Sequence, residues 1–313
     1  IAALKAALKS SLPPFDAGTA PALVPNLVTG RLANRLDFRG TNYIVDAACA
    51  SSLIAVERGL VDLQDGRCDL ALVGGIHAST PPPIYQIFSQ LEALSPSGAI
   101  RPFDAAADGT LLGEGVGLLC LKRLHDAETA GDRIYALLRG VGVASDGRGL
   151  GVLAPRLEGE TLAIRRAYAE AGVEPASVGL IEAHGTATKV GDATEIEAIR
   201  EEFGTEGPPR ALGSVKSNIG HCLPASGAAG LIKAALALHH RVLPPTRVET
   251  PNPDLGIEAS GTYLITEPRP WIHGGDTPRR VGVNAFGFGG INAHAVLEEY
   301  RPGPEPDPVL TRS

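Results

Sequence analysis

The sequence lacks the features that would place it in several classes of protein. No apolar run approaches the roughly 20 residues of a membrane-spanning helix, and no secretory signal peptide is evident. The 28 basic residues are outnumbered by 35 acidic ones, and the net charge of −7 argues against nucleic acid or an anionic membrane as a main partner. Only four cysteines occur, and no pair of His and Cys has a zinc-binding spacing. We therefore expect a cytoplasmic protein with reduced thiols and no metal site.

The chain is long enough to fold around a large core. Its 313 residues are 44% hydrophobic, which suits one domain or two closely joined halves. Helix-like and strand-like patterns alternate along the chain, and this order predicts a layered α/β fold. The helical patterns cover residues 53–64, 159–171, 193–203 and 228–241, and the strand-like runs cover 70–73, 116–121, 136–145 and 263–265.

A cysteine, Cys49, lies at the junction of a strand-like and a helix-like segment. Residues 42–45 predict a short strand, and the apolar spacing over 53–63 predicts a helix that ends near Asp65. A thiol at this junction would face unpaired backbone N–H groups and the positive end of a helix dipole, which lower its pKa. The small residues from 47 to 52 would let a substrate carbonyl approach the sulfur. Taken alone, Cys49 would be better explained as a buried cysteine at a tight corner.

Two histidines could assist such a nucleophile. His184 follows a hydrophobic strand pattern and precedes Gly185, and His221 follows Gly220 in a loop after a second short strand pattern. Strand exits are where α/β proteins place binding and catalytic groups, and an adjacent glycine leaves room for a ligand. A single histidine would more often be structural. Two histidines in parallel contexts, with a cysteine in a third, favour a catalytic site.

A glycine-rich segment, residues 283–294, reads Val-Asn-Ala-Phe-Gly-Phe-Gly-Gly-Ile-Asn-Ala-His. Glycine permits backbone angles at which an amide N–H could point into a cavity and stabilise an oxyanion. An ordinary glycine-rich turn explains the same segment equally well.

Together, these motifs resemble the β-ketoacyl synthases, the condensing domains of polyketide and fatty-acid synthases. The cysteine, the two histidine loops and the Gly-Phe-Gly-Gly segment 287–290 occur in the family's order and approximate spacing, and residues 101–104 and 113–115 are further family segments. The resemblance runs from Pro25 to Glu299. The motif at residues 215–221 resembles that of type I polyketide synthases. The variants around the cysteine and the first histidine resemble iterative enediyne and polyunsaturated-fatty-acid synthases.

The resemblance implies a thiolase-like fold of two similar halves, layered α-β-α-β-α, and a decarboxylative Claisen condensation. Cys49 would accept an acyl group, and His184 and His221 would stabilise the enolate formed from a malonyl-type extender. Lys216 would hold the histidine network, although a solvated lysine at a strand end is the open alternative. Phe288 would gate the cavity, and its backbone N–H would join that of Cys49 in the oxyanion hole. The implied substrate-binding residues are Thr186, Thr188, Asn218, Phe286, Gly287 and Gly289.

The family also implies partners. Substrates would arrive on the phosphopantetheine of an acyl carrier protein, so no cofactor is expected in this domain. A homodimer and neighbouring polyketide synthase domains are expected, and no nucleic acid or membrane partner. The remaining carboxylates in the motifs, Asp46, Asp104, Glu114 and Asp192, are expected to bond backbone groups in tight loops, and His294 is expected to be structural.

Residues 1–301 are expected to form the synthase domain and residues 302–313 a proline-rich tail or linker. The segment before Cys49 is shorter than in the family, and the chain starts at Ile1 without any methionine, so we expect its N-terminal part to be missing. Two other functions stay open. A catalytically silent, chain-length-factor-like or decarboxylase-only relative would usually lose the cysteine or a histidine. A thiolase-type acyltransferase would use a second cysteine in place of the histidine pair.

Overall fold

The computed structural model describes residues 2–11, 24–78, 80–149, 151, 154–275 and 277–302. Its contacts divide the chain into two compact units, Ile1–Val45 and Asp46–Ser313. Most of the proline-rich tail expected over 302–313 lies outside the described residues. No helix among the described residues combines the length and apolar character needed to cross a membrane.

The described residues of the first unit include the helices α1 (Ala2–Ser11) and α3 (Asn26–Leu36). Helix α3 is capped by Asp37, which adopts a left-handed conformation (φ 53°) and donates its backbone N–H to Ala33 O. The strand predicted over residues 42–45 is wrong, because these residues pair with no other strand among those described. A β-branched and aromatic run forms a strand only where a neighbouring strand satisfies its backbone groups.

The second unit is built around a six-stranded mixed sheet, with the strand order β3-β10-β9-β4-β5-β7. The bounds are β3 Leu137–Ser145, β4 Leu180–Glu182, β5 Arg210–Gly213, β7 Thr262–Leu264, β9 Arg280–Gly287 and β10 Ile291–Glu298. Strands β9, β4, β5 and β7 run parallel to one another. The carboxyl ends of β4, β5 and β9 therefore share one edge of the sheet, where α/β proteins commonly bind ligands.

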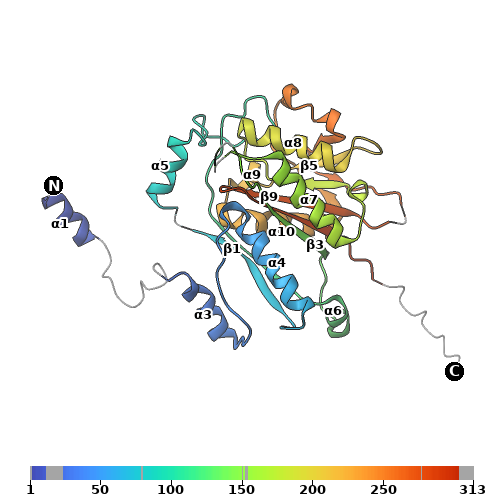
Figure 1. Cartoon of the computed structure of the whole chain (residues 1–313), viewed down its shortest axis with the longest axis horizontal. Helices are drawn as coiled ribbons and strands as arrows, with labels where there is room; N and C mark the ends of the chain where they lie inside the picture. Colours follow the sequence, from blue (N-terminus) through green and yellow to red (C-terminus); the bar gives the residue numbers. More distant parts are fainter. Residues whose placement is uncertain are drawn as a thin grey trace. The chain divides into compact units, whose positions relative to one another are not determined.

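Four long helices cover the two faces of this sheet (Figure 1). Helices α7 (Leu157–Ala171) and α8 (Lys189–Phe203) pack on one face, while α4 (Ser51–Gln64) and α10 (Ser226–His240) pack on the other. Strand β3 and helix α7 approach each other so closely that position 142 must be glycine, because an added Cβ there would lie 2.1 Å from Ala163 O.

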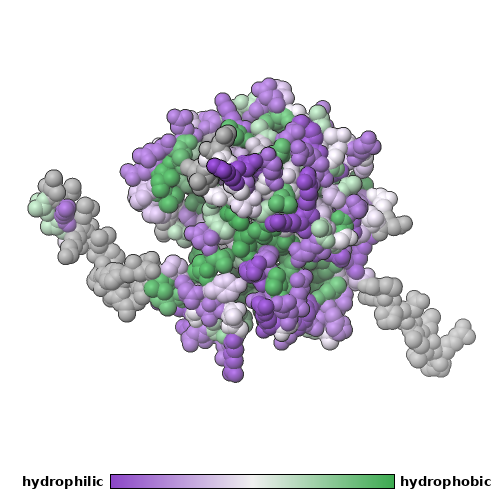
Figure 2. Space-filling model, in the orientation of Figure 1, coloured by the Kyte–Doolittle hydropathy of each residue, from purple (hydrophilic) through white to green (hydrophobic). Residues whose placement is uncertain are grey.

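A second, smaller sheet packs against α4 and α10 from the opposite side. Strands β1 (Ala71–His77) and β2 (Gly115–Leu121) form its antiparallel pair. Gly117 faces α10, so Val116 and Leu118 point the other way and are largely exposed. Figure 2 shows hydrophobic residues gathered over the region of α4. The order helix, sheet, helix, sheet confirms the predicted layered α/β fold, with six strands in the larger of these two sheets and two in the smaller. Residues Val242–Leu243 and Arg269–Pro270 form a separate two-stranded antiparallel pair.

The remaining elements are short. They are α5 Pro82–Gln90, α6 Leu124–Ala130, α9 Lys216–Ile219, β6 Val242–Leu243, β8 Arg269–Pro270 and the 3-10 turns η2 Ala48–Ala50, η3 Pro175–Ser177, η4 Leu223–Ala225, η5 Pro253–Leu255 and η6 Glu258–Ser260. The four predicted long helices are confirmed, and each begins two to four residues before its predicted start. Helices α4 and α10 begin with small or polar residues, so the apolar repeat does not reach their first turns.

Candidate active site

Cys49 lies in the 3-10 turn η2, directly before helix α4. Ala48 adopts a left-handed conformation (φ 48°), and the Asp46 carboxylate accepts the Ala48 N–H at 3.0 Å. Such a conformation is unfavourable for alanine and is typical of backbone held at functional sites. The Ser51 hydroxyl accepts the Ala47 N–H at 2.9 Å. These contacts fix the cysteine in a buried position, 5% exposed.

His221 contacts the cysteine directly. Its Nε2 lies 3.1 Å from Cys49 Sγ, and its Nδ1 lies 2.7 Å from the hydroxyl of Ser226. An Nδ1–H that donates to Ser226 leaves Nε2 free to accept the thiol proton. The His221 backbone N–H donates to Leu111 O at 2.7 Å, and the preceding Gly220 has φ 75°. Both ring nitrogens of this buried histidine therefore have partners.

His184 lies beside this pair, at the carboxyl end of β4. Its ring centroid is 5.5 Å from that of His221 and 5.8 Å from that of Phe286. The backbone N–H groups of His184 and Gly185 donate to the two carboxyl oxygens of Glu195 at 2.6 and 2.8 Å. The Nδ1 atom of His184 has no hydrogen-bond partner among the described residues. The structure thus brings the predicted cysteine and both predicted histidines together.

Lys216 is buried behind the histidines, with 3% of its surface exposed. It lies on the one-turn helix α9 and not on a strand end, so the solvated-lysine alternative is wrong. Burial lowers the pKa of Lys216 from 10.5, and the nearby carboxyls of Glu182 and Glu195 oppose that shift. Burial and the Lys216 charge lower the pKa of His184 and of His221 well below 6.5. Both imidazoles are therefore neutral at neutral pH.

The cysteine itself differs from the sequence-based expectation. Burial raises the pKa of Cys49 to about 11, although the Lys216 charge and the backbone N–H groups of Phe288 and Cys49 act in the opposite direction. The predicted lowering of this pKa is wrong for the resting thiol, because Phe88, Ala93 and Leu223 pack around Cys49 and exclude water. The resting group is a neutral thiol beside a neutral imidazole.

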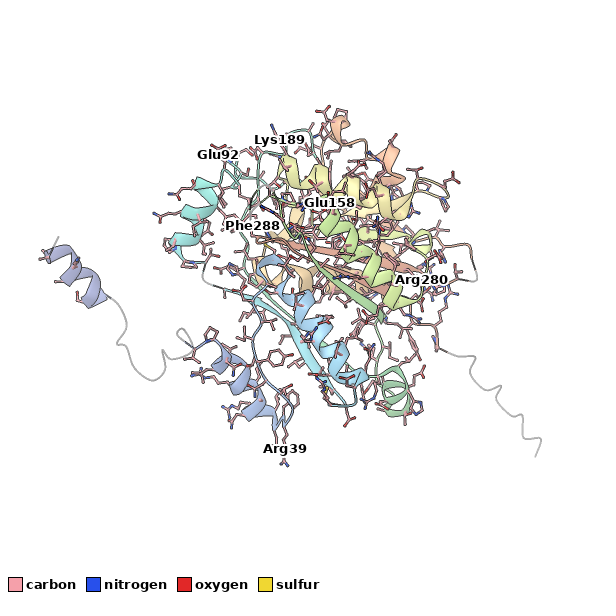
Figure 3. All side chains as sticks on the ribbon, viewed as in Figure 1. Arg39, Glu92, Glu158, Lys189, Arg280 and Phe288 are labelled. Atoms are coloured by element: carbon pink, nitrogen blue, oxygen red, sulfur yellow. The ribbon has the colours of Figure 1, made fainter. Side chains whose placement is uncertain are left out.

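A cavity of about 680 Å³ borders this site on the side of His184 and is lined by His184, Phe286, Gly287 and Phe288. Cys49 and His221 are not among its lining residues. Figure 3 labels three lining residues from separate segments, Glu92, Lys189 and Phe288. Residue Phe288 is 38% exposed, and its ring centroid lies 5.4 Å from that of Phe88.

Two predicted substrate-binding threonines also line the cavity. The hydroxyls of Thr186 and Thr188 lie 3.2 Å apart on its wall. Two other predicted substrate-binding residues, Asn218 and Gly289, do not line the cavity. Asn218 is exposed and donates to Pro245 O at 3.4 Å, because the α9 turn points it away while Lys216 points inward. Gly289 is not among the lining residues, and its φ of 90° serves the turn between β9 and β10.

The carboxylates expected to bond backbone groups do so. Asp46, Asp104, Glu114 and Asp192 accept backbone N–H groups at 2.7–3.1 Å. His294 lies in β10 and bonds the Asn284 side chain, as a structural residue would. Among the described residues, no group of three or more His, Cys, Asp or Glu is arranged to hold a metal ion.

Three residues of the site escaped the sequence analysis, namely Glu182, Glu195 and Ser226. Glu182 stands two residues before His184 on a strand, and Glu195 stands one helical turn after Asp192. Both spacings place side chains on one face and could have indicated them. Nothing in the sequence around Ser226 indicates its contact with His221.

Comparison with known proteins agrees with this geometry. The profile of the β-ketoacyl synthase N-terminal domain matches residues 7–127, that of the C-terminal domain matches residues 135–248, and that of the ketoacyl-synthetase C-terminal extension matches residues 251–311. A polyunsaturated fatty acid synthase subunit from Thraustochytrium is 41% identical over 96% of this chain. A phenolphthiocerol/phthiocerol polyketide synthase subunit from Mycobacterium bovis is 42% identical over 89%.

Solved structures give the same result. The module 6 ketosynthase of the Bacillus subtilis bacillaene synthase aligns over 88% of this chain, at 39% identity and a TM-score of 0.85. An oxazolomycin ketosynthase domain from Streptomyces albus aligns over 96%, at 34% identity and a TM-score of 0.88. These likenesses confirm the predicted thiolase-like fold.

The chain covers 11–15% of the length of these two curated relatives and 50–53% of the two solved chains. Because profiles of both the N-terminal and C-terminal domains match, and the fold agrees, the chain belongs to the β-ketoacyl synthase family.

Proposed function

We propose that the protein catalyses a decarboxylative Claisen condensation between an acyl group on Cys49 and a malonyl-type extender carried by an acyl carrier protein. The observation that carries this proposal is the 3.1 Å contact between Cys49 Sγ and His221 Nε2, with the His184 ring 5.5 Å from the His221 ring. A nucleophile in hydrogen-bond reach of a base that a third group orients is the arrangement of covalent catalysis.

In the first step, the thiol proton moves to His221 Nε2 and the thiolate attacks the carbon of an acyl thioester. Ser226 holds the imidazole in the tautomer that can accept this proton. The tetrahedral oxyanion forms beside the backbone N–H groups of Cys49 and Phe288, which already face the sulfur. The carrier thiol leaves with a proton, and the acyl group stays on Cys49.

In the second step, a malonyl thioester enters the cavity and loses carbon dioxide. Before this step His221 takes the tautomer in which Nδ1 accepts the Ser226 hydroxyl and Nε2 carries the proton. The electron pair of the broken C–C bond then moves onto the thioester oxygen, where neutral N–H donors from His184 and His221 stabilise the enolate. The enolate carbon then attacks the acyl carbon, the C–S bond to Cys49 breaks, and the thiolate is released. The charge of the buried Lys216 lowers the pKa of both histidines, so that they stay neutral.

Other residues complete the site in this proposal. Phe288, which is partly exposed between the cavity and Phe88, acts as the gate for the extender. The threonine hydroxyls of the cavity wall, together with Phe286 and Gly287, contact the substrate arm. The proposed partners are an acyl carrier protein, a second copy of the chain and neighbouring polyketide synthase domains. A cytoplasmic location, with four free cysteines in its support, belongs to the same proposal.

Incubation with an acyl thioester, followed by mass spectrometry of the intact protein, tests the proposal. We expect an acyl adduct on the wild-type protein and none on Cys49→Ala. Subsequent malonyl-pantetheine should discharge the adduct and yield a β-ketoacyl thioester. A wild-type protein without an adduct would overturn the proposal. An adduct that malonyl-pantetheine never discharges would favour a relative that does not elongate.

A further inference from the structure

One carboxyl group in the substrate cavity is not used by the proposed mechanism. Glu160 lies in the first turn of α7, is 1% exposed, and lines the same cavity as His184 and Phe288. Its Oε2 atom is enclosed and has no hydrogen-bond partner among the described residues. A buried polar atom without a partner is rare in folded proteins and requires an explanation.

The groups around Glu160 are already occupied. Asp146 Oδ1 accepts the side-chain N–H of Asn292 at 2.6 Å. Glu195 accepts the backbone N–H groups of His184 and Gly185, and also the side-chain amide of Asn284 at 2.8 Å. Because these neighbours already have partners, the Oε2 atom of Glu160 stays unsatisfied within a residue that lines the cavity.

The surroundings of Glu160 favour the protonated form, which can donate a hydrogen bond. Burial, the Glu195 carboxyl from α8 and the Asp146 carboxyl after β3 raise the pKa of Glu160 well above 4.5. Strand β10 contributes the uncharged Asn292 to the same cavity. The protonated carboxyl carries an O–H that is withdrawn from water, and an unmatched buried donor destabilises the folded protein. A ligand oxygen would satisfy it.

We propose that Glu160 donates a hydrogen bond to an uncharged carbonyl or hydroxyl oxygen of the bound thioester substrate, at a position other than the reacting thioester. The inference rests on the proposed function, because it assigns a specificity-determining residue to that same cavity. The ligand oxygen is uncharged because an anion would lie beside the carboxyl groups of Asp146 and Glu195. It belongs either to the acyl chain or to an amide of the carrier arm.

The test measures the rate of Cys49 acylation with four thioesters. Butyryl and 3-oxobutyryl groups are each supplied on ethanethiol, which has no amide, and on pantetheine. Glu160→Leu removes the donor, and Glu160→Gln keeps one. Glu158→Gln is the matched control, because Glu158 lies on the same helix with a side chain 72% exposed (Figure 3).

We expect Glu160→Leu to slow acylation by about two- to tenfold only for thioesters that carry the recognised oxygen. A loss confined to the 3-oxobutyryl pair assigns the oxygen to the acyl chain, and a loss confined to the pantetheine pair assigns it to the carrier arm. Glu160→Gln and the control should stay near wild type. Equal rates for Glu160→Leu and wild type, or an equal loss with all four thioesters, would overturn the inference.

Two further readouts separate the possible failures. The wild-type preference should fade as pH rises through the raised pKa of Glu160, whereas that of Glu160→Gln should not change. Both Glu160 variants should keep or raise the midpoint of thermal unfolding. A lower midpoint would show that Glu160 has a structural partner and would contradict the inference. A wild-type protein that is not acylated at all overturns the proposed function itself, and this inference with it.

Discussion

The loops that carry His221 and His184 are held in similar ways but leave their imidazoles in different states. His221 has partners on both ring nitrogens, Cys49 and Ser226, and is 2% exposed. His184 is half-buried, and its Nδ1 has no partner among the described residues. The difference indicates a division of work. We propose that His221 acts on the cysteine of the resting protein and that His184 is available for the substrate.

A buried carboxylate holds each loop, and the two carboxylates differ in charge balance. Glu182 accepts the Val215 N–H before the His221 loop and pairs with Lys233 Nζ, at 2.6 Å in each case. Glu195 holds the His184 loop and is bonded only by uncharged donors among the described contacts. Burial raises the pKa of Glu195. The His221 loop thus depends on an ion pair, and the His184 loop depends on hydrogen bonds.

The largest expected effect breaks that ion pair. Glu182→Gln leaves the Lys233 ammonium buried without its partner, and we expect a loss of about 3–5 kcal/mol in the free energy of unfolding. Urea unfolding measures it. The matched variant Glu195→Gln removes no ion pair. It should lose about 1–3 kcal/mol, because one of the two backbone N–H groups that Glu195 accepts would then face the NH2 group of the glutamine. Equal losses in the two variants would remove the distinction between the loops.

A smaller effect is expected at Ser226, whose hydroxyl contacts Nδ1 of the His221 ring. The Nδ1 atom of His184 has no such partner among the described residues. Ser226→Ala removes the hydroxyl that fixes the tautomer of His221. We expect acylation of Cys49 to slow by about tenfold, equivalent to roughly 1.4 kcal/mol. Carbon dioxide release from malonyl-pantetheine should change less, because His184 keeps its supports. Rates of adduct formation and of carbon dioxide release measure the two effects. An unchanged acylation rate would show that the tautomer does not depend on this serine.

The smallest expected effect is a pH dependence of stability that arises from Asp192, on the helix that also carries Glu195. Burial raises the pKa of Asp192 from 3.8 to about 7 in the folded protein. Between these values, the folded protein holds a proton that the unfolded chain releases, so stability falls as pH rises and levels off above about 7. Asp192→Asn should flatten this slope between pH 4.5 and 8, as the urea midpoint would show. An identical slope in the variant would contradict the raised pKa.

The sequence allowed the convergence of the site residues to be predicted, because it depends on topology. His184 follows β4, and Lys216 follows β5. Phe288 follows β9, and the parallel register of β4 with β5 and β9 brings these ends to one edge. Cys49 at the start of α4 completes the set, since α4 packs on the adjacent face.

Features that depend on tertiary packing could not be predicted. The local helix-dipole argument predicted a lowered pKa for Cys49, but the residues that exclude water from it, such as Phe88 and Leu223, come from distant segments. The family resemblance implied that Asn218 binds the substrate, but the α9 turn points it outward. The burial of Glu182 and Glu195 likewise follows from how α8 and α10 pack against the sheet.

The most direct test compares Cys49 acylation with carbon dioxide release in His184→Ala and His221→Ala. We expect His221→Ala to lose acylation by about a hundredfold or more, since the buried thiol loses its base. We expect His184→Ala to form the acyl adduct near the wild-type rate but to release carbon dioxide about a hundred- to thousandfold more slowly. If His184→Ala instead lost acylation as strongly as His221→Ala, the assignment of the two imidazoles would be contradicted.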